Sequence, residues 1–96
     1  MNNTLRVIHD QKNERFYSTI EGKDAELNYK IIDTKVMDFL NVYVPPEFRR
    51  QGIAEKIVTR GMEYAKGHGF RVRLSCPYVN NFVKIHRNDY KDMVVQ

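Results

Sequence analysis

The residues best suited to chemistry in this chain lie in a short basic loop. Arg49 and Arg50 supply positive charge, and Gly52 and Ala54 follow them with little or no side chain, so a ligand can approach the backbone closely. The chain after Gly52 reads as the start of a helix, whose first N–H groups lack partners within the helix and whose dipole adds positive potential. Positive side chains beside such a helix start predict a site for an anion, in particular a phosphate group.

Two well-known glycine-rich phosphate motifs are absent, because the chain contains neither GxxxxGK[ST] nor GxGxxG. An ordinary strand-to-helix turn with a solvated arginine pair is the simpler alternative. The surroundings favour the anion site: an apolar strand end, Val42–Val44, precedes the loop, and Pro45 and Pro46 end that strand because proline cannot donate to a ladder. Strand, loop and helix start are therefore expected to meet within a few residues.

Four predicted strands come before the loop and must position it. Alternating apolar and polar residues mark the third strand, and aromatic and β-branched residues mark the second. The fourth is apolar on both faces, so we expect an antiparallel meander with this strand buried on both sides. The strands span Leu5–Asp10, Arg15–Ile20, Ala25–Ile31 and Val36–Val44, and their expected core aromatics are Phe16, Tyr29, Phe39 and Tyr43.

A helix is predicted from Gly52 to Lys66, because apolar residues recur along one stripe and glycines follow it. A strand over Phe70–Cys76 comes next, and a strand–helix–strand connection makes it parallel to the fourth strand. A second helix is predicted from Pro77 to Asn88, with Tyr90–Val95 as a last strand or a docked tail.

These elements predict one α+β (mixed α/β) domain over residues 1–96, in the order ββββαβα. Ligands of such sheets tend to bind at the C-terminal ends of parallel strands. That rule places Val44, the Arg49–Ala54 loop and Cys76 around one cleft.

Composition narrows the classes of function. The net charge of +4 permits an anionic cofactor or nucleic acid, but no run of Lys and Arg exceeds two residues and no RNA-binding aromatic motif occurs, which argues against nucleic acid. A single cysteine cannot form an internal disulfide, so a reducing cytoplasm is expected. Three histidines and one cysteine show no metal-ligand spacing, and no apolar run is long enough for a membrane helix or a secretion signal.

The loop pattern Arg49-x-x-Gly52-x-Ala54 resembles the pyrophosphate loop of the GNAT N-acetyltransferases, Q/R-x-x-G-x-G/A. The stretch VPPEFRRQGIAEKIV, the run Ser75–Val79 and the trailing Ile85–Val94 are similar to the small YjdJ-type branch of that superfamily, a GNAT domain without the two helices that usually follow its first strand. The resemblance covers most of the chain.

This resemblance implies that acetyl-CoA is bound as a co-substrate and that its acetyl group passes to an amine. It implies three sets of contacts: backbone pairing with the pantetheine amides, a cradle for the pyrophosphate, and a flank from the second helix. In that order the implied residues are Val42, Tyr43 and Val44; Arg49, Arg50, Gln51, Gly52, Ile53, Ala54 and Glu55; and Tyr78, Asn81 and Phe82.

Acetyl transfer requires a neutral amine, a polarised thioester carbonyl and a proton for the leaving sulfur. Many GNAT enzymes place a tyrosine on the second helix for that proton, and this chain has Arg87 there. The catalytic candidates are then Cys76, as a thiolate nucleophile or a neighbour of the CoA sulfur, and His86, as its proton partner. A buried, inert cysteine and a core histidine are the alternatives, and Glu47 fits a turn carboxylate better than a base.

The preferred hypothesis is an acetyl-CoA-dependent N-acetyltransferase whose acceptor is a small amine or a protein. The missing lid helices predict an open acceptor site. A CoA or acyl-CoA-binding module with little catalytic activity is the second hypothesis, and a basic nucleic-acid-binding domain is a distant third. We expect no membrane partner, and a monomer or weak dimer, because an exposed edge strand could pair.

Overall fold

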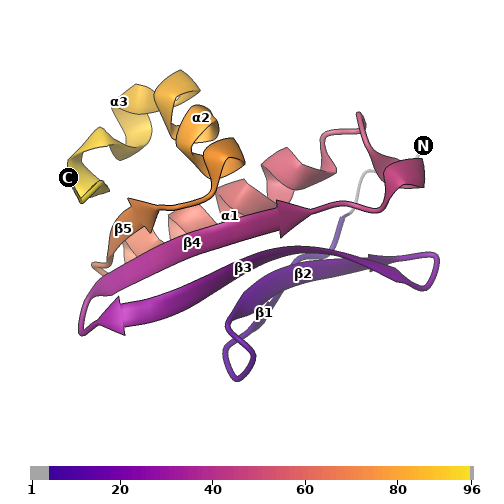
Figure 1. Ribbon diagram of the computed structural model, residues 1–96, viewed down its shortest axis with the longest axis horizontal. Helices are drawn as coiled ribbons and strands as arrows, with labels where there is room; N and C mark the ends of the chain where they lie inside the picture. The colour runs from indigo at the N-terminus through magenta and orange to yellow at the C-terminus, as the bar shows by residue number, and fades with distance from the viewer. Residues whose placement is uncertain (1–4, 96) are drawn as a thin grey trace.

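The protein folds as one five-stranded mixed sheet with helices packed against it (Figure 1). The structure, a computed structural model, describes residues 5–95. The strands follow the order of the chain across the sheet, antiparallel from the first to the fourth, and the fifth runs parallel to the fourth. The elements are β1 Ile8–Asp10, β2 Arg15–Ile20, β3 Lys23–Asp33, β4 Val36–Tyr43, α1 Ile53–Gly67, β5 Arg71–Leu74, α2 Pro77–Ile85 and α3 Arg87–Tyr90, with 3₁₀ turns η1 Pro46–Phe48 and η2 Lys91–Met93.

The predicted meander, the crossover and the parallel fifth strand are confirmed. Several element boundaries differ: β1 begins at Ile8 rather than Leu5, β3 is longer at both ends, β5 is shorter than predicted, and β4 and α1 differ by one residue at their ends. The predicted second helix breaks after Ile85, and the short helix α3 follows it. The order of elements is thus ββββαβα with one extra helical turn at the end.

Helix α1 covers the central strands and closes the core. Phe16, Leu27 and Phe39 from three neighbouring strands are fully buried beneath it. Gly61 sits at the point of closest approach, where an added Cβ would lie 2.7 Å from Cδ2 of Leu27. The absence of a side chain at Gly61 therefore sets how closely the helix can pack against the sheet.

The expectation that β4 is buried on both faces holds for Met37–Phe39, which are all buried, and is wrong for the rest of the strand. Met37 and Phe39 are buried, whereas Leu40 and Tyr43 are 41% and 46% exposed. The register against β3 shifts at Leu40, since Phe39 opposes Tyr29 while Asn41 opposes Asn28. An extra residue in one strand bends it locally and redirects its side chains. Tyr43 is therefore not the core aromatic that its strand position suggested.

One face of the sheet carries no helix among the described residues: α1 lies behind the strands in Figure 1, and β2, β3 and β4 face the viewer uncovered. Tyr17, Glu26 and Tyr43 lie side by side in register across these three strands. Burial of the second half of β4 on both faces would have required another element to cover this side.

The C-terminal segment docks against the edge of the sheet, as predicted. Val94 forms a parallel bridge with Val72 of β5, and the N–H of Val95 donates to the carbonyl of Val72 at 2.8 Å. The hydroxyl of Tyr90 donates to Glu63 on α1 at 2.7 Å. These contacts fix α3 beside α1. Within residues 5–95, the structure contains no helix that is long and apolar enough to cross a membrane.

Candidate functional site

A cleft of about 400 Å³ opens where the end of β4 meets the starts of α1 and α2. We call it the β4–α1 cleft. Its walls are mostly apolar side chains and backbone, with two arginines at the loop. It is lined by Val42, Tyr43, Val44, Phe48, Arg49, Arg50, Gly52, Ile53, Ala54, Glu55 and Tyr78.

The cleft exists because β4 and β5 separate. Their paired residues end at Phe39 and Leu74, and one further bond follows, from the N–H of Cys76 to the carbonyl of Phe39 at 2.9 Å. Beyond that bond β4 continues to Tyr43, but the chain after Cys76 turns into α2. Pro77 at the first position of α2 favours this turn, because proline suits the start of a helix and cannot extend a sheet ladder. One edge of β4 is thereby open to an extended ligand.

The loop presents the start of α1 to this cleft. Gly52 is the N-cap residue with φ of 78°, and an added Cβ there would have no neighbouring atom within 4 Å. Only glycine adopts this left-handed conformation without steric cost. The N–H groups of the first helical turn, which have no acceptor within the helix, therefore lie against open space.

The two arginines of the loop differ in their contacts. Nε of Arg49 donates to the carbonyl of Val44 at 2.7 Å, and its guanidinium lies 5.7 Å from the centre of the Tyr43 ring. Arg49 therefore ties the loop to the end of β4. Arg50 has φ of 67°, and in the described part of the chain its side chain has no hydrogen-bond or ion-pair partner. Arg50 is thus the cation better placed to meet an anion.

Most of the residues predicted to contact the cofactor line the β4–α1 cleft, and three do not. Gln51 and Asn81 are exposed but do not line the cleft. Phe82 is buried, and the centre of its ring lies 4.3 Å from that of His86 and 6.1 Å from that of Tyr90. Sequence reasoning missed Phe48, which lines the cleft. An aromatic residue directly before the arginine pair was the available signal.

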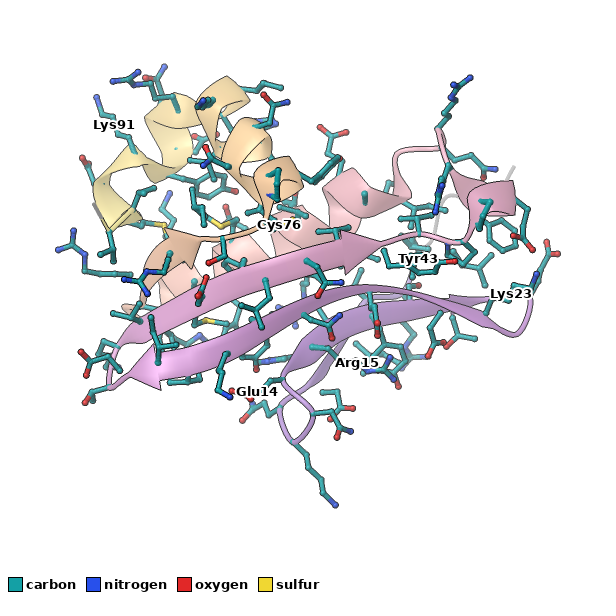
Figure 2. The ribbon with its side chains drawn as sticks, in the orientation of Figure 1. Glu14, Arg15, Lys23, Tyr43, Cys76 and Lys91 are labelled. Atoms are coloured by element: carbon teal, nitrogen blue, oxygen red, sulfur yellow. The ribbon has the colours of Figure 1, made fainter. Side chains whose placement is uncertain are left out.

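The structure does not bring the two catalytic candidates together. Cys76 is the N-cap of α2 and His86 is its C-cap, so the nine-residue helix holds them apart. A rise of about 1.5 Å per residue places the two backbones roughly 15 Å apart along the helix. Cys76 is 4% exposed and lies at the point where β4 and β5 separate (Figure 2). His86 instead contacts Glu55, with its Nε2 3.7 Å from a carboxylate oxygen. A direct Cys76–His86 proton pair is therefore wrong.

Glu47 does not line the β4–α1 cleft. It forms an ion pair with Lys23, the first residue of β3, and its hydrogen bond to that ammonium lowers the pKa of the Glu47 carboxyl below its usual value. A carboxylate held in this way keeps its negative charge and is a weak base. The reading as a turn residue is confirmed.

Tyr78 brings the one phenol on α2 to the cleft wall, where it is 44% exposed. Burial, then the neighbouring carboxylate of Glu55 and the thiol of Cys76, raise the pKa of the Tyr78 hydroxyl above its usual value. The hydroxyl consequently remains protonated near neutral pH and can donate a hydrogen bond or a proton.

Asp38 is a buried carboxylate that the sequence did not mark. It is 8% exposed, and its Oδ1 has no hydrogen-bond partner among residues 5–95. In register it lies between Lys30 of β3 and Arg73 of β5, one residue before the last β4–β5 bond. Unpaired buried polar atoms are rare and call for an explanation.

Together, the mixed sheet, the separation of β4 and β5 and the helix start at Gly52 are the features of a small GNAT-like domain. Residues 15–93 match the model of the GCN5-related N-acetyl-transferase family, and the chain belongs to this family.

The chain is also similar to curated proteins and to a solved structure. The chain is 30% identical to Protein NATD1 of Xenopus tropicalis over 83 residues, which is 84% of this chain and 76% of that protein. It is 26% identical to Protein NATD1 of Homo sapiens over 82 residues, with 83% and 73% covered. The solution structure of a GCN5-like putative N-acetyltransferase from Staphylococcus aureus superposes with a TM-score of 0.74 at 19% identity, covering 98% of this chain and 91% of that one, so the two share a fold.

Proposed function

We propose that this chain binds acetyl-CoA in the β4–α1 cleft and transfers the acetyl group to an amine. The observation that carries the proposal is the juxtaposition of an open β4 edge with the first turn of α1 across Gly52. Acetyl-CoA combines an anionic pyrophosphate, an amide-bearing arm and an acetyl group activated as a thioester. The cleft offers a matching partner for the first two, and the activated acetyl group supplies the driving force.

Two parts of the cleft do the binding in this proposal. The first-turn N–H groups of α1 and the guanidinium of Arg50 hold the pyrophosphate, because both are positive and lack partners nearby. The backbone of Val42 and Val44 pairs with the amides of the arm along the open edge of β4. Arg49, already bonded to the carbonyl of Val44, positions the loop.

Tyr78 is the proton donor that we propose for the leaving sulfur. It is on the wall of the cleft, it stays protonated near neutral pH, and it comes from the helix that flanks the separation of the strands. A positioned acid of this kind contributes roughly 10²–10⁴ in rate. Arg87, at the position where many GNAT enzymes carry tyrosine, is exposed and does not line this cleft.

The acceptor is proposed to arrive on the uncovered face of the sheet, where Asp38 accepts the proton of the amine. Burial with an unpaired oxygen is costly for a carboxylate unless a ligand or a function compensates. An uncovered face with no lid helix admits a small amine or a protein side chain equally. Asp38→Asn keeps the shape of the side chain and should lower turnover at least tenfold while leaving acetyl-CoA affinity unchanged.

Cys76 and His86 keep separate proposed roles. Cys76 lies at the separation of β4 and β5 and is the candidate neighbour of the thioester sulfur. His86 contacts Glu55, which lines the cleft, so we propose that it positions this carboxylate rather than moving a proton for Cys76. His86→Gln should then change the KM for acetyl-CoA and leave kcat unchanged.

The decisive experiment combines calorimetric titration of acetyl-CoA and CoA with turnover on a panel of small amines and lysine-bearing peptides. Saturable binding together with an acetylated amine supports an N-acetyltransferase. Binding of both ligands without any acetylated product favours the alternative, a CoA-binding module. Failure to bind either ligand would overturn the assignment of the cleft.

A further inference from the structure

A second cavity, of about 260 Å³, lies between α2, the end of β5 and the C-terminal segment. We call it the C-terminal basic cavity. Its apolar floor is formed by Leu74, Val83 and Val94. Tyr78 lines the β4–α1 cleft, whereas Asn80, two residues later on α2, lines this cavity. A separation of two residues places their side chains about 200° apart around the helix axis. The two hollows therefore lie on opposite sides of α2.

Three cations surround the apolar floor. Lys84 of α2, Arg87 of α3 and Lys91 of η2 all line the cavity, and the carboxamide of Asn80 joins them. Figure 2 labels Lys91 beside α3, at the end of the ribbon away from the β2–β3 turn. In residues 5–95 none of these three side chains has an ion-pair or hydrogen-bond partner. Their positive charges are thus uncompensated where they converge.

The sequence concentrates its excess charge in the same region. Residues 1–65 contain ten Lys and Arg against ten Asp and Glu, whereas residues 66–96 contain six against two. The entire net charge of +4 therefore comes from the last third of the chain. The two acids there, Asp89 and Asp92, are exposed and neither lines the cavity. An uneven charge of this kind attracts anions to one side of a molecule.

Helix stability accounts for only part of this arrangement. A cation in the last turn of a helix interacts favourably with its dipole, which explains Lys84 at the end of α2. It does not explain why Arg87 and Lys91, from two further elements, border the same hollow. Solvated surface cations also do not need an apolar floor beneath them, whereas small-molecule sites typically combine apolar walls with a few placed polar groups.

We propose that the C-terminal basic cavity binds a compact organic anion, with at least two negative charges on a small apolar body, such as a phosphate monoester. The apolar body would contact Leu74, Val83 and Val94, and the charges would meet Lys84, Arg87 and Lys91. The site does not depend on catalysis in the β4–α1 cleft.

The test is an NMR titration of isotope-labelled protein with phenyl phosphate in the absence of CoA, because the phosphate groups of CoA would compete for the same cavity. Inorganic phosphate tests the charge without the apolar body, and phenol tests the apolar body without the charge. We expect saturable amide shifts at Asn80, Lys84, Arg87 and Lys91, with phenyl phosphate binding more tightly than either control. The triple variant Lys84→Gln, Arg87→Gln, Lys91→Gln should bind about tenfold more weakly, since exposed charge pairs contribute up to about 1 kcal/mol each.

A matched control removes the same net charge elsewhere. Arg6, Lys12 and Lys30 are exposed and line neither hollow, so the triple change of these residues to Gln should leave phenyl phosphate binding within about twofold of wild type. If both triple variants weaken phenyl phosphate binding equally, the binding depends only on the net charge of the protein, and the proposal is overturned. Shifts that do not saturate would also overturn it. Tight binding of duplex or single-stranded DNA, lost in the first triple variant alone, would replace it with a nucleic-acid surface.

Discussion

A methyl group at position 52 is the sharpest test of the proposed anion site. Gly52 and Gly69 have nearly the same left-handed backbone, with φ of 78° and 73°, and an added Cβ would meet no atom within 4 Å at either position. Gly52→Ala and Gly69→Ala therefore impose the same kind of strain. Only Gly52 lines the β4–α1 cleft.

The expected loss of stability is similar for the two variants. A left-handed conformation costs a residue with a Cβ about 1–2 kcal/mol, and the smaller entropy of the unfolded alanine chain returns about 0.4–1 kcal/mol. A net loss of about 1 kcal/mol should lower Tm by roughly 4–8 °C in a domain of this size. Differential scanning calorimetry should give the same shift for both variants.

Binding should separate them. A methyl group at Gly52 blocks close approach to the first-turn N–H groups of α1, and a hydrogen bond to a charged group contributes about 1.5–3 kcal/mol. Loss of one such bond corresponds to roughly 10- to 100-fold weaker binding. Calorimetric titration should show this loss for Gly52→Ala and wild-type affinity for Gly69→Ala. If both variants bind acetyl-CoA equally well, the helix start does not hold the pyrophosphate.

Four further outcomes are expected. Tyr78→Phe should lower kcat by at least tenfold and leave the KM for acetyl-CoA nearly unchanged, because the ring remains and only the hydroxyl proton donor is lost. A change in KM alone would contradict the role of Tyr78 as an acid. If transfer passes through the thiol, mass spectrometry after incubation with acetyl-CoA should show one added acetyl group that is absent in Cys76→Ser, whereas wild-type turnover in Cys76→Ser would exclude the thiol route. Burial, then Arg60 and His68, lower the pKa of His9, so the folded state binds fewer protons than the unfolded chain. The free energy of unfolding should therefore fall as pH drops below about 6.5. Denaturant titrations should find a flatter pH dependence of this free energy in His9→Phe, and an unchanged pH dependence would exclude His9 as the cause. Gly61→Ala should lower the free energy of unfolding by about 1–2 kcal/mol, since its Cβ would lie 2.7 Å from Leu27 and 3.3 Å from Phe39. Gly67→Ala, in the same helix but with open space around it, should raise the free energy of unfolding by up to about 1 kcal/mol.

The pattern of apolar residues was sufficient to predict the order of elements. Period-two alternation in β3 and the apolar stripe of α1 are local signals, because each reports which side of one element is buried. The loop around Gly52 was also predictable, since the need for a left-handed residue before a helix is a property of a few neighbouring residues. Ten of the thirteen residues predicted to contact the cofactor consequently line the cleft.

Two of the three errors share a cause. Tyr43 reads as a core aromatic, but the shift in register at Leu40 and the bare face of the sheet leave it exposed. Phe82 reads as a cleft residue, but α3 folds back and its Tyr90 stacks on it. Cys76 and His86 read as partners, but α2 keeps them at opposite ends. The first two errors concern which other element lies beside a residue, whereas the third follows from the length of α2 alone.

The sequence by itself determined the elements, their order, the parallel fifth strand and the anion-competent loop, because local periodicity and backbone preference act over a few residues. Only the tertiary structure decided that Asp38 is buried with an unpaired oxygen, that Arg49 is bonded to Val44 while Arg50 is not, and that three cations from α2, α3 and η2 converge on one hollow. Burial, pairing and convergence depend on contacts between residues far apart in the chain, and no local pattern in a single sequence encodes those distances.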